Sequence, residues 1–290
     1  MNMRTFTTII AFVALAFSLM ACSQKTSYNG SGFFGGKTVK ASNNYVTKAI
    51  KVDNFTSINL LGSPDITYTQ KAGKPQVEVY TSDNIVDLLD INVKGGTLQV
   101  GFKKGTNVSY DKLEVRVTSE TLNGISVTGS GDIILTNGLK TDDLKISVAG
   151  SGDIEANNIT CTNNLSVSIA GSGDIEGNHI TCANLEASVA GSGDMDLKNI
   201  TTTKTQASVA GSGTAVLSGT TQEASYSVAG SGDLQATDFQ AKRISASIAG
   251  SGDIKCYATD FLKVRTSGSG SVGYKGNPEL DQPKKGLYKL

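Results

Sequence analysis

The triplet Gly-Ser-Gly occurs eight times between residues 129 and 270, at spacings of 18 to 21 residues. An apolar and a small residue precede the first seven copies, and an Asp follows six of those seven. Such a regular period of about twenty residues is typical of a solenoid, in which each repeat is one coil that cannot bury its apolar face alone. We therefore expect one body of stacked coils rather than two separate globules.

The repeat has the alternation of a β-strand. In the segment 144–149 apolar residues alternate with polar or small ones, so the apolar side chains share one face. Residues 150–152 then turn the chain, a short strand follows over 153–156, and Asn157-Asn158 turns the chain again before Ile159. Stacking such coils makes parallel strands, and the favoured crossover hand makes the product a right-handed parallel β-helix.

The predicted fold class is therefore all-β, a right-handed parallel β-helix with an inserted N-terminal β segment and a short helix. The segment 61–66 is a decayed copy of the repeat, so the solenoid is expected to begin near residue 50, with strands over 75–117 inserted as a side sheet. The short helix is expected over 83–89, with Asp83 as its N-cap. The predicted segments are a lipoprotein signal peptide at 1–21, a flexible tether at 22–44, an N-terminal β segment that begins the solenoid at 45–122, the repeat β-helix at 123–274 and a C-terminal cap at 275–290.

The first 22 residues have the features of a targeting segment. Arg4 supplies a positive charge, an apolar run covers 9–20, and Leu19-Met20-Ala21-Cys22 matches a lipobox. The run is too short for a permanent membrane span. We expect cleavage before Cys22 and acylation of that residue, which would tether the protein to a membrane of the bacterial cell envelope. An outer-membrane lipoprotein facing either the periplasm or the outside is predicted; an ordinary secretory signal that contains a Cys is the alternative.

Two of the remaining cysteines occupy the same repeat position. Cys161 and Cys182 lie 21 residues apart, so they are expected on adjacent coils about 4.8 Å apart. A disulfide is geometrically allowed at that separation. Burial as small apolar side chains is the alternative, because Cys161 has the inward parity of Ile159. The chain has no CxxC pair and His179 is its one histidine, so a transition-metal site is not predicted.

The two glycines of each triplet are expected to allow positive φ and a close approach between coils, which a Cβ would obstruct. A phosphate-binding loop needs a helix N-terminus behind it, and here a strand follows. The repeated Ser lacks the base and the orienting acid that a nucleophile needs. Neither nucleotide binding nor serine chemistry is therefore predicted.

The Asp after the triplet forms a column of carboxylates along the predicted stack. Carboxylates about 4.8 Å apart repel by roughly 0.9 kcal/mol per neighbouring pair in water, so the column must face solvent, accept backbone N–H groups or hold cations. An Asx-type closure of each turn is one interpretation, and calcium held between coils is the other. Thr214 and Ser271 interrupt the column. The calcium candidates are Asp132, Asp153, Asp174, Asp194, Asp233 and Asp253.

Composition and regularity argue against several functions. Lys plus Arg and Asp plus Glu number 26 each, so no basic excess indicates nucleic acid. Enzymatic sites on β-helices need a cleft and acids or bases placed without repetition, whereas these coils vary by a residue or two from residue 129 onward. Sugar platforms favour exposed aromatic residues, yet the chain has no Trp, and Tyr226 and Tyr257 have core-facing positions. A non-catalytic protein is therefore predicted.

The lipobox, the segment 58–66 and the seven copies of Ala/Thr-Gly-Ser-Gly-Asp/Thr together resemble a known family. It is the putative auto-transporter adhesin, head GIN domain, family of Bacteroidetes-type bacteria. The resemblance covers about residues 45–274 and includes the sequence Gly-Tyr-Lys-Gly-Asn-Pro at 273–278. It implies a right-handed β-helix in a cell-envelope protein. It supplies no catalytic residues that can be matched here.

Three functions remain. The first is a lipid-anchored envelope protein whose coils present a repetitive surface for adhesion to an envelope macromolecule or a glycan. The second is a structural element that assembles into homo-oligomers, and the third is a polysaccharide-active enzyme. The segment 277–290, with Pro278, Pro283 and Lys284-Lys285, is predicted to cover the edge of the last coil. Such a cap favours a discrete particle over a fibre.

Overall fold

The structure is a computed structural model, and it describes residues 38–281 and 286–290 of the 290-residue chain. The predicted signal peptide, Cys22 and the tether as far as residue 37 lie outside the described residues, as do Pro283 and Lys284-Lys285. The described residues belong to one unit that spans 36–290. No helix in this part of the chain is long and apolar enough to cross a membrane.

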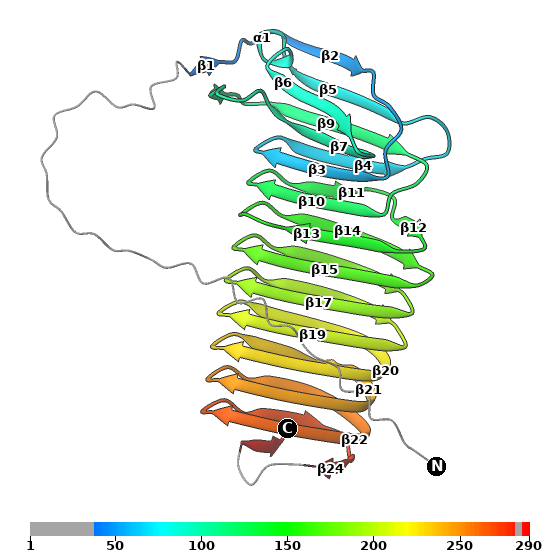
Figure 1. Ribbon diagram of the computed structural model, residues 1–290, viewed down its shortest axis with the longest axis vertical. Helices are drawn as coiled ribbons and strands as arrows, with labels where there is room; N and C mark the ends of the chain where they lie inside the picture. The colour runs from blue at the N-terminus through cyan, green and yellow to red at the C-terminus, as the bar shows by residue number, and fades with distance from the viewer. Residues whose placement is uncertain (1–37, 282–285) are drawn as a thin grey trace, which may run out of the picture. The chain divides into compact units, whose positions relative to one another are not determined.

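Strands of successive coils pair in parallel and in register (Figure 1). On one side of the coil, β15 (Asn164–Gly171) pairs with β17 (Asn184–Gly191). On the return, β16 (Ile175–Thr181) pairs with β18 (Met195–Thr201). Figure 1 shows the chain crossing the near face, turning and returning behind as it advances toward the C-terminus, which is the right-handed sense. The predicted right-handed parallel β-helix is confirmed.

In four successive coils the second bend is made by a residue with a positive φ. Asn158, His179 and Asn199 have φ values of 58°, 58° and 52°, and in the following coil Gly219 has a φ of 128°. Asn and Gly are the residues that reach positive φ most readily. The turn predicted at Asn157-Asn158 is therefore a bend at Asn158 inside β14 (Ile154–Cys161), which does not end there. His179 adopts the same conformation because the coils on both sides of it impose the same bend.

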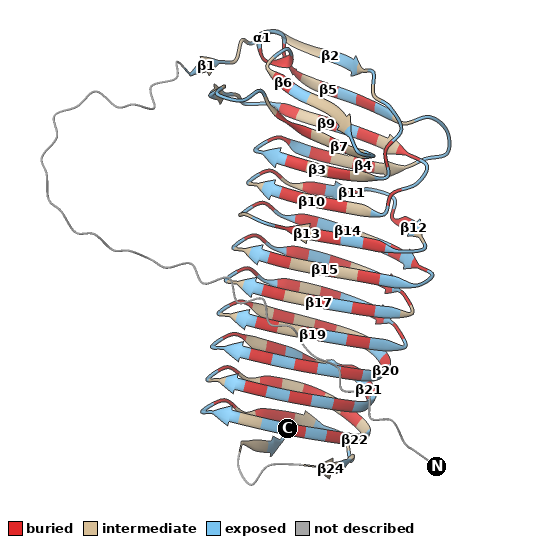
Figure 2. Ribbon diagram, in the orientation of Figure 1, coloured by how far each residue is buried: buried red, intermediate tan, exposed pale blue. Residues whose placement is uncertain are grey.

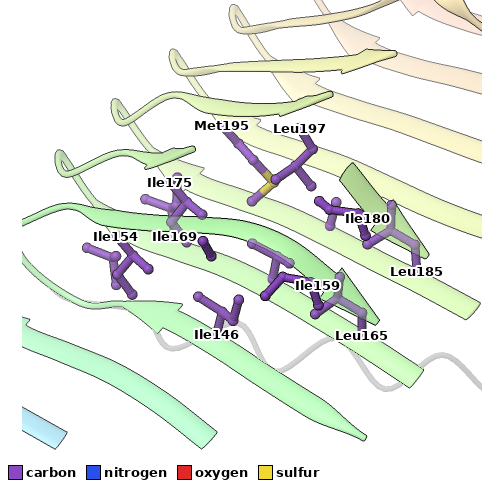
Figure 3. Packing of buried hydrophobic residues seen from close by; sticks show 14 of the residues in the cluster. Ile146, Ile154, Ile159, Leu165, Ile169, Ile175, Ile180, Leu185, Met195 and Leu197 are labelled. Atoms are coloured by element: carbon purple, nitrogen blue, oxygen red, sulfur yellow. The ribbon is translucent and has the colours of Figure 1, made fainter. Parts of the chain in front are cut away.

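The core consists of columns in which like residues stack along the axis (Figures 2 and 3). Ile154, Ile175 and Met195 form one column, and each is at most 1% exposed. Where one member is large its neighbours are small: Tyr226 lies between Ala207 and Ala246. A parallel stack requires this compensation, because each side chain shares its space with the same position of the next coil.

The decayed copy of the repeat forms the first coil. β3 (Ser57–Gly62) and β4 (Asp65–Gln70) are its two strands, and β3 pairs with β10 (Gly124–Gly129) so that Gly62 lies opposite Gly129. Pro64 occupies the position of the second glycine of the later triplets. In the later coils the N–H at this position donates to the glycine carbonyl of the preceding turn. No Gly-Ser-Gly turn precedes the first coil, so proline, which lacks an N–H, loses no such hydrogen bond here.

The insertion after the first coil is not the side sheet that the sequence predicts. β7 (Thr97–Phe102) pairs in parallel with β3, and β9 (Leu113–Ser119) pairs in parallel with β4. The insertion therefore continues both sides of the helix and covers its N-terminal end. β2 (Tyr45–Ile50) and β5 (Gln76–Ser82) add antiparallel strands to this cover. The end of a stack exposes unpaired backbone N–H and C=O groups, and the strands of the insertion cover them.

The helix and the end of the predicted tether differ from expectation. α1 is a single turn, Asp83–Val86, and its N-cap is Ser82, so Asp83 is the first helical residue. β1 (Val39–Lys40) pairs with β8 (Val108–Ser109), and the Ser42 N–H donates to Asn84 Oδ1 at 2.9 Å. The last residues of the predicted tether are therefore bound to the insertion.

The C-terminal segment forms an incomplete last coil. β24 (Glu279–Asp281) pairs with β22 (Ile254–Gly268), and β25 (Leu287–Lys289) pairs with β23 (Val272–Lys275), both in parallel. Arg265 fixes this segment by donating to both carboxylate oxygens of Asp281, at 3.0 and 2.9 Å. The other elements are β6 (Leu89–Lys94), β11 (Ile133–Leu135), β12 (Leu139–Thr141), β13 (Leu144–Val148), β14 (Ile154–Cys161), β19 (Lys204–Gly211), β20 (Thr214–Gly230) and β21 (Asp233–Gly250).

The two glycines of the triplet have different functions. The first has a φ between 117° and 158° in seven of the eight copies, and its carbonyl accepts two N–H groups of the next turn. Thus Gly171 O accepts the N–H of Ser192 at 2.9 Å and that of Gly193 at 3.2 Å. The second glycine is outside the positive-φ range, but a Cβ there would overlap the backbone of the preceding coil. Only the first glycine thus adopts a positive φ, whereas both glycines lie too close to the backbone of the preceding coil to carry a Cβ.

We expect Gly191→Ala to lower the free energy of unfolding by about 2 kcal/mol or more. The new Cβ would overlap the carbonyl oxygen of Gly171 at a φ of 137°. Chemical denaturation followed by circular dichroism measures the change. Ser192→Ala in the same exposed turn is the control, with an expected change below about 0.5 kcal/mol. Equal unfolding midpoints for the two variants would contradict this account of the turn.

Candidate functional site

The Asp after each triplet accepts a hydrogen bond from the next coil. The Asp153 N–H donates to Asp132 Oδ1 at 2.9 Å, and the Asp174 N–H donates to Asp153 Oδ1 at 2.8 Å. The Asp194 N–H donates to Asp174 Oδ1 at 2.8 Å. The series begins at Asp65 of the first coil, whose Oδ1 accepts the Asp132 N–H at 3.0 Å. We call this series the Asp ladder.

The Asp ladder corrects the predicted Asx-type turn. Each carboxylate bonds to the coil that follows rather than to its own turn, so it joins coils instead of closing a turn. A hydrogen bond to a charged acceptor contributes about 1.5 to 3 kcal/mol. The repulsion between neighbouring carboxylates is roughly 0.9 kcal/mol in water, so the hydrogen bond outweighs it.

The ladder is interrupted at Thr214. The Thr214 N–H still donates to Asp194 Oδ1 at 2.8 Å, but Thr offers no carboxylate to the next coil. The Asp233 N–H therefore turns to Gly213 O, at 3.2 Å. The ladder resumes where the Asp253 N–H donates to Asp233 Oδ1 at 2.9 Å. It ends at Ser271, whose N–H and hydroxyl both donate to Asp253 Oδ1 at 2.8 Å.

The ladder provides no ready-made metal centre. Across residues 38–281 and 286–290, no three His, Cys, Asp or Glu side chains are grouped so that they could hold a metal ion. Partial burial raises the pKa of Asp65, the first carboxylate, and the charge of Asp132 adds to the rise. Calcium at the ladder carboxylates stays a prediction, which thermal melting with and without chelator would test.

The three described cysteines, Cys161, Cys182 and Cys256, are buried. The pairing of Thr160 with Thr181 brings Cys161 beside Cys182, and they are 3% and 5% exposed. Burial raises the pKa of Cys161 to about 12, with a smaller effect from Cys182, and it also raises the pKa of Cys182. Burial likewise raises the pKa of Cys256 to about 12. A disulfide between Cys161 and Cys182 stays a prediction.

A groove that the sequence analysis did not predict crosses six coils. It has a volume of about 600 Å³ and lies where the strands of one sheet begin, from β15 to the later part of β22. Two outward-facing columns line it. One column carries Ser, Glu, Gln, Ser, Ser and Lys in successive coils. The other column consists of Asn164, Asn184, Lys204, Glu223, Arg243 and Phe261, each paired in register with the next.

The two ends of the second column differ in chemistry. At the first end the side-chain amide of Asn184 donates to Asn164 Oδ1 at 3.0 Å. At the other end the guanidinium of Arg243 lies 4.9 Å from the centre of the Phe261 ring. Arg243 is exposed, and among the described residues its guanidinium has no hydrogen-bond acceptor or ion pair. A guanidinium held flat on a ring keeps its N–H donors available for a ligand.

The sequence contained a signal for this groove that the repeat concealed. Every member of the second column lies seven residues before the first glycine of a triplet. The triplet is constant, whereas this position changes from Asn through charged residues to Phe261. The sequence argument against a sugar platform rested on the absence of Trp and on two tyrosines. Tyr226 is buried as expected, but Tyr257 is half-buried and pairs with the exposed Gln240. Aligning the coils on their triplets would have shown the column.

Two smaller hollows lie elsewhere on the coils. One, of about 480 Å³, follows the second bend and includes His179, Asn199 and Thr181. The other, of about 210 Å³, follows the Asp ladder and includes Asp153 and Glu155. A third hollow, of about 410 Å³, lies beside the loop at 73–75 and includes Phe55, which is buried. None of the three presents an exposed Phe, Tyr or Trp side chain. The six-coil groove is therefore our candidate site.

The chain matches the family described as putative auto-transporter adhesin, head GIN domain, over residues 54–215 and 158–278. The two matches together cover well over half of the chain. The protein belongs to this family. The predicted resemblance is thereby confirmed.

Solved structures agree with membership of the head GIN domain family. A putative lipid binding protein from Parabacteroides distasonis is 30% identical, with 88% of this chain and 100% of that chain covered and a TM-score of 0.64. A putative adhesin from the same species is 26% identical over 87% and 97% of the two chains, with a TM-score of 0.63. A putative adhesin from Parabacteroides merdae is 29% identical over 87% and 96%, with a TM-score of 0.58. No curated protein matches the chain.

In this head GIN domain protein we expect Asp174→Ala to lower the free energy of unfolding by about 1 to 2 kcal/mol, because it leaves the Asp194 N–H without its acceptor. Asp174→Asn keeps an acceptor oxygen and should cost less. Urea denaturation of the variants measures both. Glu176→Ala removes a nearby exposed carboxylate that has no hydrogen bond to the next coil among the described residues, and it should change stability little. A cost for Glu176→Ala as large as that for Asp174→Ala would show that charge, not the ladder, matters.

We expect the thiols at 161, 182 and 256 to resist iodoacetamide at pH 8 in the folded protein. Burial makes them inaccessible and keeps them protonated, because their pKa values lie above the ordinary range. Mass spectrometry after alkylation measures the reaction. Denaturation without reductant then counts free thiols: three alkylated residues mean that Cys161 and Cys182 are unbridged, and alkylation at Cys256 alone means that they are bridged. Fast native alkylation would contradict the burial.

Proposed function

We propose that this protein is a lipid-anchored adhesin of the bacterial cell envelope, which binds a macromolecule through the groove over β15 to β22 without catalysing a reaction. Acylated Cys22 would hold it at the outer membrane. The stack of coils would serve as a rigid support for the groove, and the side chains of the two outward columns would make the contacts.

The observation that carries this proposal is the contrast between constant and variable positions. The triplets and the inward columns repeat from coil to coil, as stacking requires, whereas the groove column changes through Asn184, Lys204, Glu223, Arg243 and Phe261. Nothing in the packing demands this variety, because these side chains face outward. Variable, chemically mixed side chains on a rigid support are typical of binding surfaces. The family description and two of the similar structures, which are putative adhesins, support the same function.

The groove fits binding better than catalysis. Its charged residues include Lys204 and Glu223, which lie 3.9 Å apart as an exposed pair. A general acid or base is expected to sit in a protected cleft with a shifted pKa. The insertion that covers the N-terminal end of the stack also favours a discrete binder over a self-assembling scaffold.

Accessibility on intact cells tests the proposal. If the protein is a surface adhesin, protease added to whole cells should degrade it, and deletion of its gene should reduce attachment of the cells to a glycan-coated surface. A Cys22→Ser variant should be released from the membrane and should fail to restore attachment. Full protection from protease would place the protein in the periplasm and end the adhesion proposal. Polysaccharide turnover by the purified protein would end the non-catalytic part.

A further inference from the structure

We infer that the groove binds an acidic polysaccharide, whose chain lies along the stack and whose carboxylate is held by Arg243 beside Phe261. This inference rests on the proposed binding function and names the ligand class for the same groove. It follows from the charges, the aromatic ring and the dimensions of the groove.

The charges of the groove are unbalanced at one end. Lys204 has its partner in Glu223, at 3.9 Å. Arg243, on the next coil, forms no salt bridge with any described residue. Lys263, one coil further, lies opposite Asp281 in register, and its charge contributes to lowering the pKa of Asp281. Both cations line the groove, so its end over β21 and β22 presents Arg243 as the cation without a carboxylate partner. The complementary ligand carries negative charge at that end.

The arrangement of Arg243 favours a carboxylate over a diffuse polyanion. The guanidinium is held 4.9 Å from the centre of the Phe261 ring, which restricts its orientation. A planar guanidinium donates two parallel hydrogen bonds to a carboxylate. Phe261 is half-buried, so part of the ring remains available to the C–H groups of a sugar. Nucleic acid would need a longer series of cations than these.

The other end of the groove is suited to neutral sugar units. Asn164 and Asn184 present side-chain amides, Ser166 presents a hydroxyl, and the exposed carboxylate of Glu186 lies beside them. A sugar hydroxyl can donate to Glu186, whereas a second carboxylate would be repelled there. Six coils with a separation of about 4.8 Å span about 24 Å between the first and the last. That length exceeds a small molecule and matches several linked sugar rings. A chain with hydroxyl groups along its length and a carboxylate near one end satisfies both halves of the groove.

Calorimetry with a defined acidic oligosaccharide tests the inference. The full-length protein, purified in detergent, is titrated with a xylohexaose that carries a single glucuronic acid near one end, in the presence of EDTA, and separately with the methyl ester of that uronate, which has the same backbone without the charge. We expect the acid to bind and the ester to bind at least about tenfold more weakly. Arg243→Gln and Phe261→Ala should each weaken binding of the acid by about tenfold. Arg243→Lys keeps the charge but loses the planar fork, and it should fall between the native protein and Arg243→Gln.

Lys255→Gln is the matched control, because Lys255 is a cation of β22 that does not line the groove. It should leave binding unchanged. Equal binding of acid and ester would identify a neutral glycan and overturn the inference. Equal losses in Lys255→Gln and Arg243→Gln would mean non-specific attraction to a polyanion and also overturn it. Circular dichroism checks folding, and Phe261→Leu replaces Phe261→Ala if the latter unfolds.

Failure of this inference can be told apart from failure of the proposed function. If cells attach through the protein while the purified protein binds no uronate-bearing xylohexaose, the ligand class is wrong and adhesion stands. If that oligosaccharide binds while gene deletion leaves attachment unchanged, the groove binds acidic sugars without acting in adhesion.

Discussion

The structure depends on one repeated contact, in which the carbonyl of the first glycine in a turn accepts two N–H groups of the next turn. This contact sets the distance between coils at the tightest point, where a Cβ would overlap the neighbouring backbone. Once the turns are stacked at that distance, the strands on either side pair in register and the inward side chains meet their counterparts. The hydrophobic columns supply the larger share of the stability, but the glycine turns decide which residues face one another.

The same contact separates the positions that stacking constrains from the outward positions that are free to bind a ligand. Inward positions must match their neighbours in size, as Ala207 and Ala246 do around Tyr226. The turns must keep their glycines, and the Asp ladder must keep an acceptor. The outward positions are under none of these constraints, so they can vary from coil to coil while the backbone stays the same. The groove with Arg243 and Phe261 lies on such positions.

The fold could be predicted from the sequence because the constraint on each coil appears in the sequence at a constant spacing. The triplets predicted the stacking, and the alternation around them predicted which residues are buried. Interactions between coils were harder to foresee: the carboxylate of Asp174 could satisfy its own turn or the next one, and sequence spacing does not distinguish these. The insertion was misplaced for a similar reason, because alternation identifies β7 and β9 as strands but not their pairing with β3 and β4. The groove was not predicted because the sequence argument relied on the repeated positions, whereas the groove is lined by outward positions that differ from coil to coil.

The break at Thr214 shows that the contacts between coils are not uniform although the backbone repeats. At this coil the Asp ladder stops, and the pairings of β20 shift register on both sides, between Leu197 and Ile200 and between Val216 and Ser218. The pairing of β21 with β22 shifts register as well, between Ala236 and Gln240 and between Ala241 and Arg243. A solenoid gains its cooperativity from the contacts between neighbouring repeats, so its stability is set junction by junction rather than by the repeat alone.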